Sequence, residues 1–142
     1  VSNLKSLSHK GRMDFKAIEE VAKNFTDRLR IKTPSIEQEC MNLSGGNQQK
    51  VVIAKSLATD CEIILFDEPT RGIDVGAKSE IYDLMTELAD EGKAILMVSS
   101  DMEELLGMSD RIYVLSEGHL VGELSHNEAS QVKLMEMMSK EG

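Results

Sequence analysis

The stretch LSGGNQQK, residues 43–50, places a serine and two glycines at the start of a segment that otherwise has the character of a helix. Glycine is among the least favourable residues inside a helix, so its presence there needs a reason. A helix N-terminus offers unsatisfied backbone N–H groups and the positive end of the helix dipole, and glycines let an anion approach them closely. The segment therefore predicts a phosphate contact at Ser44, Gly45 and Gly46.

A purely structural interpretation of the same residues is also open. Ser44 is a suitable helix N-cap, and Gly45 and Gly46 could simply close a loop. Short motifs of this kind also match by chance, so the octapeptide alone does not separate the two interpretations. The rest of the chain has to decide between them.

A pair of carboxylates follows the apolar run IILF. Asp67 and Glu68 stand at the carboxyl end of this run, where α/β sheets bind their ligands. Successive side chains of an extended backbone point in opposite directions, so one carboxylate can hold hydrated Mg²⁺ while the other faces an attacking water. That division of labour suits phosphoryl transfer. The alternative is that Asp-Glu-Pro merely ends a strand, because Pro69 blocks its continuation.

The elements that position these residues follow from the spacing of apolar side chains. That spacing predicts one amphipathic helix over residues 14–30 and a second that starts at the glycines and reaches residue 59. The continuous apolar runs EIILFD and AILMVS predict strands that are buried on both faces of a parallel sheet. With the helix between them they form a βαβ unit over residues 62–99.

The rest of the chain predicts a hairpin and two further helices. Ser100 and Glu103 are spaced as a capping box for a short helix, and RIYVLS and LVGEL flank a turn, which predicts a hairpin added to the sheet. A final helix follows. We therefore expect an α/β chain in two parts, a helical part over residues 1–60 and a mainly parallel sheet with flanking helices over residues 61–142.

Composition excludes several classes of function. Of the 142 residues, 41% are hydrophobic and 29% are charged, as is ordinary for a soluble globular domain. The net charge of −9, without a long Lys/Arg run, argues against nucleic-acid binding. The only two cysteines, Cys40 and Cys61, have no metal-binding spacing and fit a reducing, cytoplasmic compartment. No apolar run approaches the roughly 20 residues that span a bilayer, so membrane association is expected through a partner.

Several segments in a fixed order carry a family resemblance: LSGGNQQKVVIAKSL, IILFDEPTRGIDVGAKSEIY and VSSDMEELLGMSDRIYVLSEGHLVGEL. Together they resemble the ATP-binding subunits of ABC transporters, above all those of bacterial monosaccharide importers of the ribose and galactose type. The resemblance covers residues 43–124. It implies a P-loop NTPase-like fold, ATP and Mg²⁺ as cofactors, and ATP hydrolysis by the intact protein.

The resemblance also implies roles for the carboxylates. In that family IILFDE is the Walker B strand and RGID is the D-loop. Asp67 would then act through Mg²⁺ and Glu68 would be the general base. Asp74, in the D-loop, would bridge two cassettes.

By the same resemblance LSGGNQ is the signature motif. In the family this motif closes over the γ-phosphate of an ATP that the opposing cassette binds. Ser44, Gly45, Gly46 and Gln48 would therefore contact a nucleotide held by another domain. On this interpretation the start of the helix forms part of the interface between two cassettes.

The sequence departs from the family in lacking a Walker A loop, GxxxxGK[ST], which cradles the phosphates. The nearest stretch, GIDVGAKS, fails because Ala77 precedes Lys78 and the second glycine, Gly76, comes one position early. The chain then resembles the rear part of a cassette, with Val1 an internal starting point. Such a fragment would expose sheet edges and apolar surface and is expected to self-associate.

A second departure lies at the switch position. Many ABC ATPases carry a histidine where LMVSSD has Ser100. The serine resembles the C-terminal cassette of the tandem-cassette sugar importers, whose own site is degenerate.

These observations lead to one hypothesis and one alternative. The hypothesis is the C-terminal part of the second cassette of a sugar importer's ATP-hydrolysing subunit, at the inner face of the bacterial cell membrane. Its partners would be an opposing cassette and membrane permease subunits. The alternative is a noncatalytic interaction module that pairs through its signature motif with another ATP-binding cassette.

Overall fold

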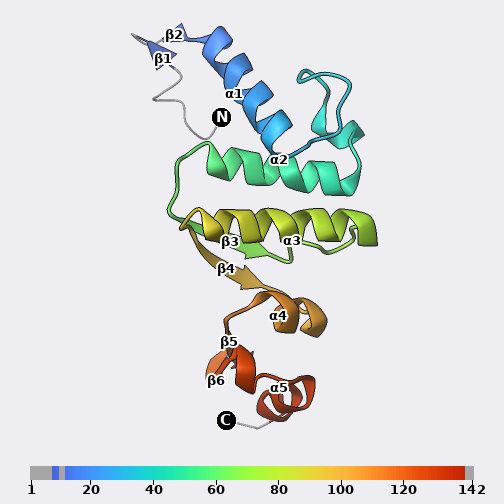
Figure 1. The fold of residues 1–142 in the computed structure, drawn as a ribbon, viewed down its shortest axis with the longest axis vertical. Coiled ribbons are helices and arrows are strands. Elements are labelled where there is room, and N and C mark those ends of the chain that lie inside the picture. The colour runs from blue at the N-terminus through green and yellow to red at the C-terminus, as the bar shows by residue number, and fades with distance from the viewer. Residues whose placement is uncertain (1–7, 10–11, 140–142) are drawn as a thin grey trace. The chain divides into compact units, whose positions relative to one another are not determined.

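The computed structural model describes residues 8–9 and 12–139, which divide into two compact units that meet between Val98 and Ser99 (Figure 1). The first unit contains, in chain order, β1 (Ser8–His9), β2 (Arg12–Met13), α1 (Phe15–Arg28), η1 (Cys40–Asn42), α2 (Gly45–Leu57), β3 (Ile63–Asp67), α3 (Val75–Asp90) and β4 (Ala94–Val98). The sequence predicts a different boundary, after residue 60, between a helical part and an α/β part. That division stays a prediction.

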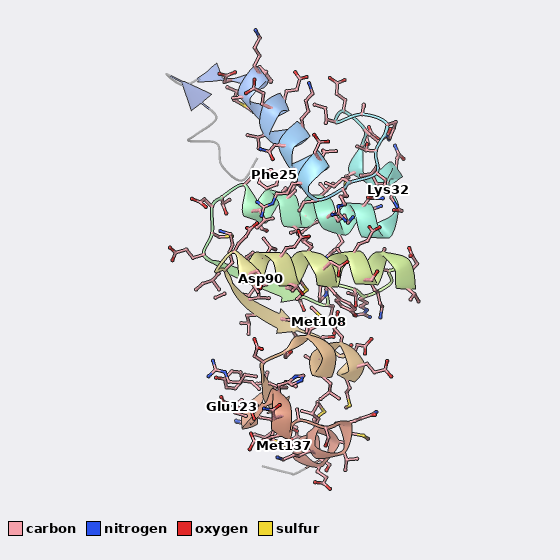
Figure 2. The ribbon with its side chains drawn as sticks, in the orientation of Figure 1. Phe25, Lys32, Asp90, Met108, Glu123 and Met137 are labelled. Carbon is pink, nitrogen blue, oxygen red and sulfur yellow. The ribbon has the colours of Figure 1, made fainter. Side chains whose placement is uncertain are left out.

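The helices of the first unit form successive layers. α1 packs on α2, α2 packs on α3, and α3 contacts β4, in the order that Figure 1 shows from α1 to the strands. The start of α1 is fixed by Asp14, whose carboxylate accepts hydrogen bonds from the backbone N–H groups of Lys16 and Ala17, each at 3.1 Å. An apolar cavity of about 480 Å³ lies between α1, the connector and α2, with Phe25 (labelled in Figure 2) in its lining. The predicted helical first third is confirmed.

β3 and β4 pair in parallel, with Ile63 opposite Ala94 and Asp67 opposite Val98. α3 connects them, so the predicted βαβ unit is confirmed. The helix ends before Gly92, whose φ of +88° suits glycine.

The two faces of this strand pair differ, and here the prediction of strands buried on both faces is wrong. Phe66 is 4% exposed and Ile64 is equally buried, whereas Leu65 is 69% exposed and Ile63 is also exposed. A continuous apolar run shows that both faces suit burial but does not supply what covers them. Within the part of the chain that the structure describes, one face is covered and the other is open.

The second unit contains α4 (Met102–Met108), β5 (Arg111–Ser116), β6 (His119–Ser125), η2 (His126–Glu128) and α5 (Gln131–Met138). Its core joins the hairpin to α5 through a buried apolar cluster: Ile112, Val114, Leu124 and Leu134. Glu117 and Gly118 form the hairpin turn, and both have positive φ, as a two-residue turn of type I′ requires.

The hairpin forms as predicted. Within the second unit, β5 and β6 pair in antiparallel fashion around the two-residue turn. The addition of this hairpin to a larger sheet stays a prediction. No helix in the described part of the chain is long and apolar enough to cross a membrane.

Candidate functional site

The first turn of α2 carries the predicted phosphate-contacting residues. Ser44 occupies the N-cap position with an extended backbone, yet its side chain makes no capping hydrogen bond to the helix. Instead its Oγ accepts a hydrogen bond of 2.8 Å from Nδ2 of Asn47. Gln48 folds back, and its Nε2 donates to the carbonyl oxygen of Leu43 at 2.8 Å. The structure therefore does not bear out the interpretation of Ser44 as a simple cap.

Asn47 is held in turn by the chain that precedes α2. Its Oδ1 accepts a hydrogen bond of 2.8 Å from the backbone N–H of Lys32, which Figure 2 shows near the start of α2. Ser44, Asn47 and Lys32 thus form a short hydrogen-bonded series. The series ties the start of α2 to the segment that follows α1.

The two glycines have different surroundings. A Cβ on Gly45 would meet only the carbonyl oxygen of Gly72, at 3.9 Å, so this position faces open space. A Cβ on Gly46 would lie 2.7 Å from the Cβ of Ala77 and 3.6 Å from Cγ2 of Ile73. Gly45 therefore leaves the helix start accessible, as the phosphate prediction requires. Gly46 is buried and allows α2 to approach α3 closely.

The carboxyl end of β3 carries Asp67 and Glu68. Asp67 is exposed and is the last residue of the strand. Glu68 has a φ of +47°, a left-handed conformation that is strained for a non-glycine residue, and its backbone N–H donates to the carbonyl oxygen of Val98 at 2.8 Å. The extended backbone expected at Glu68 is therefore wrong, since the chain turns out of the strand at this residue. Strain of this kind collects at functional sites.

Asp74 ends the loop that follows and begins α3. Its Oδ1 accepts a hydrogen bond of 2.9 Å from the backbone N–H of Ala77, so it is the N-cap of α3. Gly72, with a φ of +73°, gives the loop its turn and lies beside Gly45. The loop with Asp74 and the start of α2 are therefore neighbours in the first unit.

Ser100 lies in the second unit, between β4 and α4, and it is exposed. It is not the helix cap that the sequence predicts. Asp101 caps α4 instead, since its carboxylate accepts from the N–H groups of Glu103 at 3.0 Å and Glu104 at 3.3 Å. A charged carboxylate is the stronger acceptor at the positive end of a helix, which explains the shift by one residue.

The donor set at the end of β3 fits a magnesium ion held together with phosphate. Mg²⁺ in such sites is bound through one or two carboxylates, the substrate phosphates and water, so an exposed carboxylate such as that of Asp67 is of the kind that such a site uses. In the described residues no three His, Cys, Asp or Glu side chains are grouped to hold a metal on their own.

Sequence reasoning missed the ion pair of a buried lysine under the start of α2. Lys50 is 2% exposed and its Nζ lies 2.7 Å from Oε2 of Glu80 on α3. The hydrogen bond from Lys50 is the main cause that lowers the pKa of Glu80 below its ordinary value of 4.5. The signal in the sequence was the position of Lys50, four residues after Gly46 and therefore on the same helix face.

Comparison with known proteins places the chain among related sequences. Residues 3–71 match the ABC transporter family model. The chain is 57% identical over 119 residues to the L-arabinose transport ATP-binding protein AraG of Geobacillus stearothermophilus, covering 84% of the chain and 23% of that protein. It is 56% identical over 133 residues to the ribose import ATP-binding protein RbsA of Bacillus licheniformis, covering 94% of the chain and 27% of that protein. The chain therefore spans about a quarter of the length of these relatives.

Solved structures agree with the sequence relatives. A dimeric ATP-binding cassette in a post-hydrolysis state bound to ADP and Pi matches with a TM-score of 0.71 and 27% identity, covering 83% of the chain and 51% of that cassette. A metal-chelate type ABC transporter in an inward-facing conformation, at 19% identity and a TM-score of 0.80, shares the fold over 96% of the chain and 54% of its own length. The α/β fold with its glycine-started helix and its strand ending in Asp-Glu is thus that of an ATP-binding cassette, and the chain belongs to the ABC transporter family.

Proposed function

We propose that this chain forms the signature and Walker B part of an ATP-binding subunit that hydrolyses ATP to drive a bacterial sugar importer. The observation that carries the proposal is the start of α2, where Ser44 leaves the helix uncapped and Gly45 faces open space beside the loop that leads to Asp74. The sugar-import names of the relatives support the substrate class.

The carboxylates at the end of β3 receive separate tasks in this proposal. Asp67 would hold Mg²⁺, which supplies charge neutralisation for the transferred phosphate. Glu68 would accept a proton from the attacking water. Its positive φ, of +47°, is the kind of backbone strain that collects at functional sites. Ser100 stands where many relatives of this fold have a switch histidine, so we propose that hydrolysis at this half's own site is weak.

The start of α2 would serve a nucleotide bound by an opposing cassette. Ser44, Gly45 and Gln48 would contact its γ-phosphate, with backbone N–H groups at the helix start as donors. Gly46 would support this surface from within, by allowing α2 to pack on α3. Asp74 would approach the opposing cassette through the oxygen that does not cap α3.

The partners in this proposal are an opposing cassette and membrane permease subunits, which would place the chain at the inner face of the cell membrane. The open face of β3 and β4, with Leu65 opposite Leu96, would be covered by protein in the working assembly. When the chain stands alone we expect this face to cause self-association. Sedimentation velocity tests that expectation, because Leu65→Lys should yield a monomer if the face is responsible.

The alternative function is a noncatalytic module that pairs with another cassette through its signature motif. Ser100 in place of the switch histidine favours it. Both functions use the start of α2, but only the first requires hydrolysis to depend on this chain. The presence or absence of Mg²⁺-dependent ATPase activity in the complete subunit separates them.

The test compares three variants of the complete subunit by steady-state ATPase activity. Gly45→Val blocks the open approach to the helix start and should lower turnover by about a hundredfold. Glu68→Gln should lower it by a smaller factor, because it removes a base from the weaker site only. Glu62→Gln, at the amino end of the same strand, is the matched control and should not change it. Abolished turnover in Glu68→Gln with full activity in Gly45→Val would contradict these assignments, and a wild-type subunit without ATPase activity would favour the alternative.

A further inference from the structure

Lys50 is a buried lysine, and burial of its charge requires compensating contacts. Lysine is almost never fully buried unless it is paired, and Lys50 is 2% exposed in the interface between α2 and α3. Its Nζ donates to Oε2 of Glu80 at 2.7 Å and to the carbonyl oxygen of Arg30 at 3.3 Å. Lys32 adds a weaker contact, with its Nζ 3.7 Å from Oε1 of Glu80. The ammonium of Lys50 therefore joins α2 to α3 and to the start of the segment that follows α1.

Stability alone does not explain this choice of residue. A buried ion pair contributes little more than well-packed apolar side chains of the same volume, because desolvation offsets the attraction. An ion pair differs from an apolar contact in being directional, since a hydrogen bond of 2.7 Å tolerates little sliding. The pair can therefore fix how far one helix lies along the other.

The ion pair lies one turn from a second close contact between the same helices. Gly46 lies against Ala77, and Lys50 and Glu80 follow at the next turn of α2 and α3. The two helices therefore run in the same direction, as Figure 1 shows, and begin at the same end of the interface. Ser44 precedes one of these starts and Asp74 caps the other.

We infer that Lys50 is a positioning residue, which together with Glu80 holds α2 in a fixed register on α3. Ser44 and Asp74 then keep one relative position and meet an opposing cassette as a single rigid surface. The consequence for ATP hydrolysis rests on the proposed function. The fixed register itself does not, because it follows from contacts within this chain.

A distance measurement on the chain tests the fixed register without reference to activity. Spin labels are placed on the native, exposed Cys40 and on Val75→Cys, with Cys61→Ser to remove the other thiol. They report the separation of η1, which directly precedes α2, from the first residue of α3. We expect Lys50→Met and Glu80→Gln to broaden the distance distribution, and Lys50→Arg to keep it narrow. Lys23→Met, which breaks the exposed pair of Lys23 with Glu19 on α1, is the matched control and should leave it unchanged. Equally narrow distributions in all variants would overturn the inference.

Enzyme kinetics of the complete subunit tests the consequence. We expect Lys50→Met to lower kcat for ATP hydrolysis by about tenfold to a hundredfold, since misplacing donors to a transferring phosphate by about 1 Å has effects of this size. KM for ATP should change by less than about twofold, and Lys50→Arg should restore kcat. A broadened distance distribution with unchanged kcat would overturn the positioning role. A wild-type subunit without ATPase activity would instead refute the proposed function, while the distance measurement would still decide the fixed register.

Discussion

The start of α2 and the end of β3 are both predicted to serve a nucleotide, but they are supported in different ways. The start of α2 rests on α3 through the pair of the buried Lys50 with Glu80 and through the close contact at Gly46. The end of β3 is aligned by its parallel pairing with β4, and one face of that pair is open at Leu65. The start of α2 is therefore held by contacts within this chain. The end of β3 depends, on one side, on the protein that covers the exposed apolar face.

The largest expected change in the free energy of unfolding comes from a comparison of Phe66 and Leu65, neighbours on β3 that face opposite sides of the strand pair. Phe66→Ala should lower the free energy of unfolding by about 4 kcal/mol, because a buried aromatic side chain is replaced by a cavity. In the monomeric chain, Leu65→Ala should change it by less than about 0.5 kcal/mol, because that side chain is 69% exposed. Urea unfolding followed by circular dichroism measures both, at a protein concentration at which the chain sediments as a monomer. A large loss in Leu65→Ala under those conditions would mean that another part of the chain covers the open face.

The free energy of unfolding should respond unequally to loss of the buried Lys50 and of the exposed Glu80. Glu80→Ala leaves the ammonium of Lys50 buried without its carboxylate, and should lower the free energy of unfolding by about 3 kcal/mol. Lys50→Met leaves Glu80, whose side chain is 43% exposed and can be solvated, and should lower it by about 1 kcal/mol. The same urea experiment applies. Equal losses would show that the pair is less buried than the structure indicates.

Substitution of the two glycines of the signature motif should have different effects on the free energy of unfolding in the same assay. Gly46→Ala forces a Cβ to within 2.7 Å of Ala77, and the overpacking should lower the free energy of unfolding by about 2 kcal/mol. Gly45→Ala adds a methyl group in open space and should be nearly neutral. Ala77→Gly should recover part of the loss in Gly46→Ala. Failure of that second change to help would place the strain elsewhere.

The smallest effect is the pH dependence of the ion pair. Lys50 lowers the pKa of Glu80 below 4.5, so the ionised carboxylate stabilises the folded chain above that pH, and this stabilisation is lost as the pH falls through the lowered value. The difference in the free energy of unfolding between wild type and Glu80→Gln should therefore shrink on acidification below pH 4.5. A difference that stays constant down to pH 3 would argue against the pairing.

The sequence predicted the local elements well because their signals are local. Apolar spacing identified α1 and α2, and the runs around Phe66 identified a parallel pair. It could not predict that Leu65 would be exposed, because an apolar side chain does not specify its cover. It also placed the cap of α4 at Ser100 rather than Asp101, since both residue types are acceptable caps.

The site was predicted in part for the same reason. The positions of Asp67 and Glu68 at a strand end followed from a local pattern, and the strand is confirmed. The contacts of Gly46 with Ala77 and of Lys50 with Glu80 join residues about 30 positions apart. No periodicity within one helix identifies the partner on another, so these contacts required the structure.

The hydrogen-bonded series at Ser44 has a consequence for the kind of ligand atom that this hydroxyl can meet. A backbone N–H can only donate, so the contact with Lys32 obliges Asn47 to present its oxygen there and its NH₂ group to Ser44. The hydroxyl of Ser44 thus already accepts a hydrogen bond, and its own hydrogen remains available for donation to a ligand. The backbone N–H of Lys32 therefore determines, through Asn47, that the hydroxyl of Ser44 acts as a donor. Such a hydroxyl favours a ligand oxygen that accepts a hydrogen bond over a donor. In Asn47→Asp the N–H of Lys32 would still donate, but the carboxylate would accept from the hydroxyl of Ser44, and that preference should be lost.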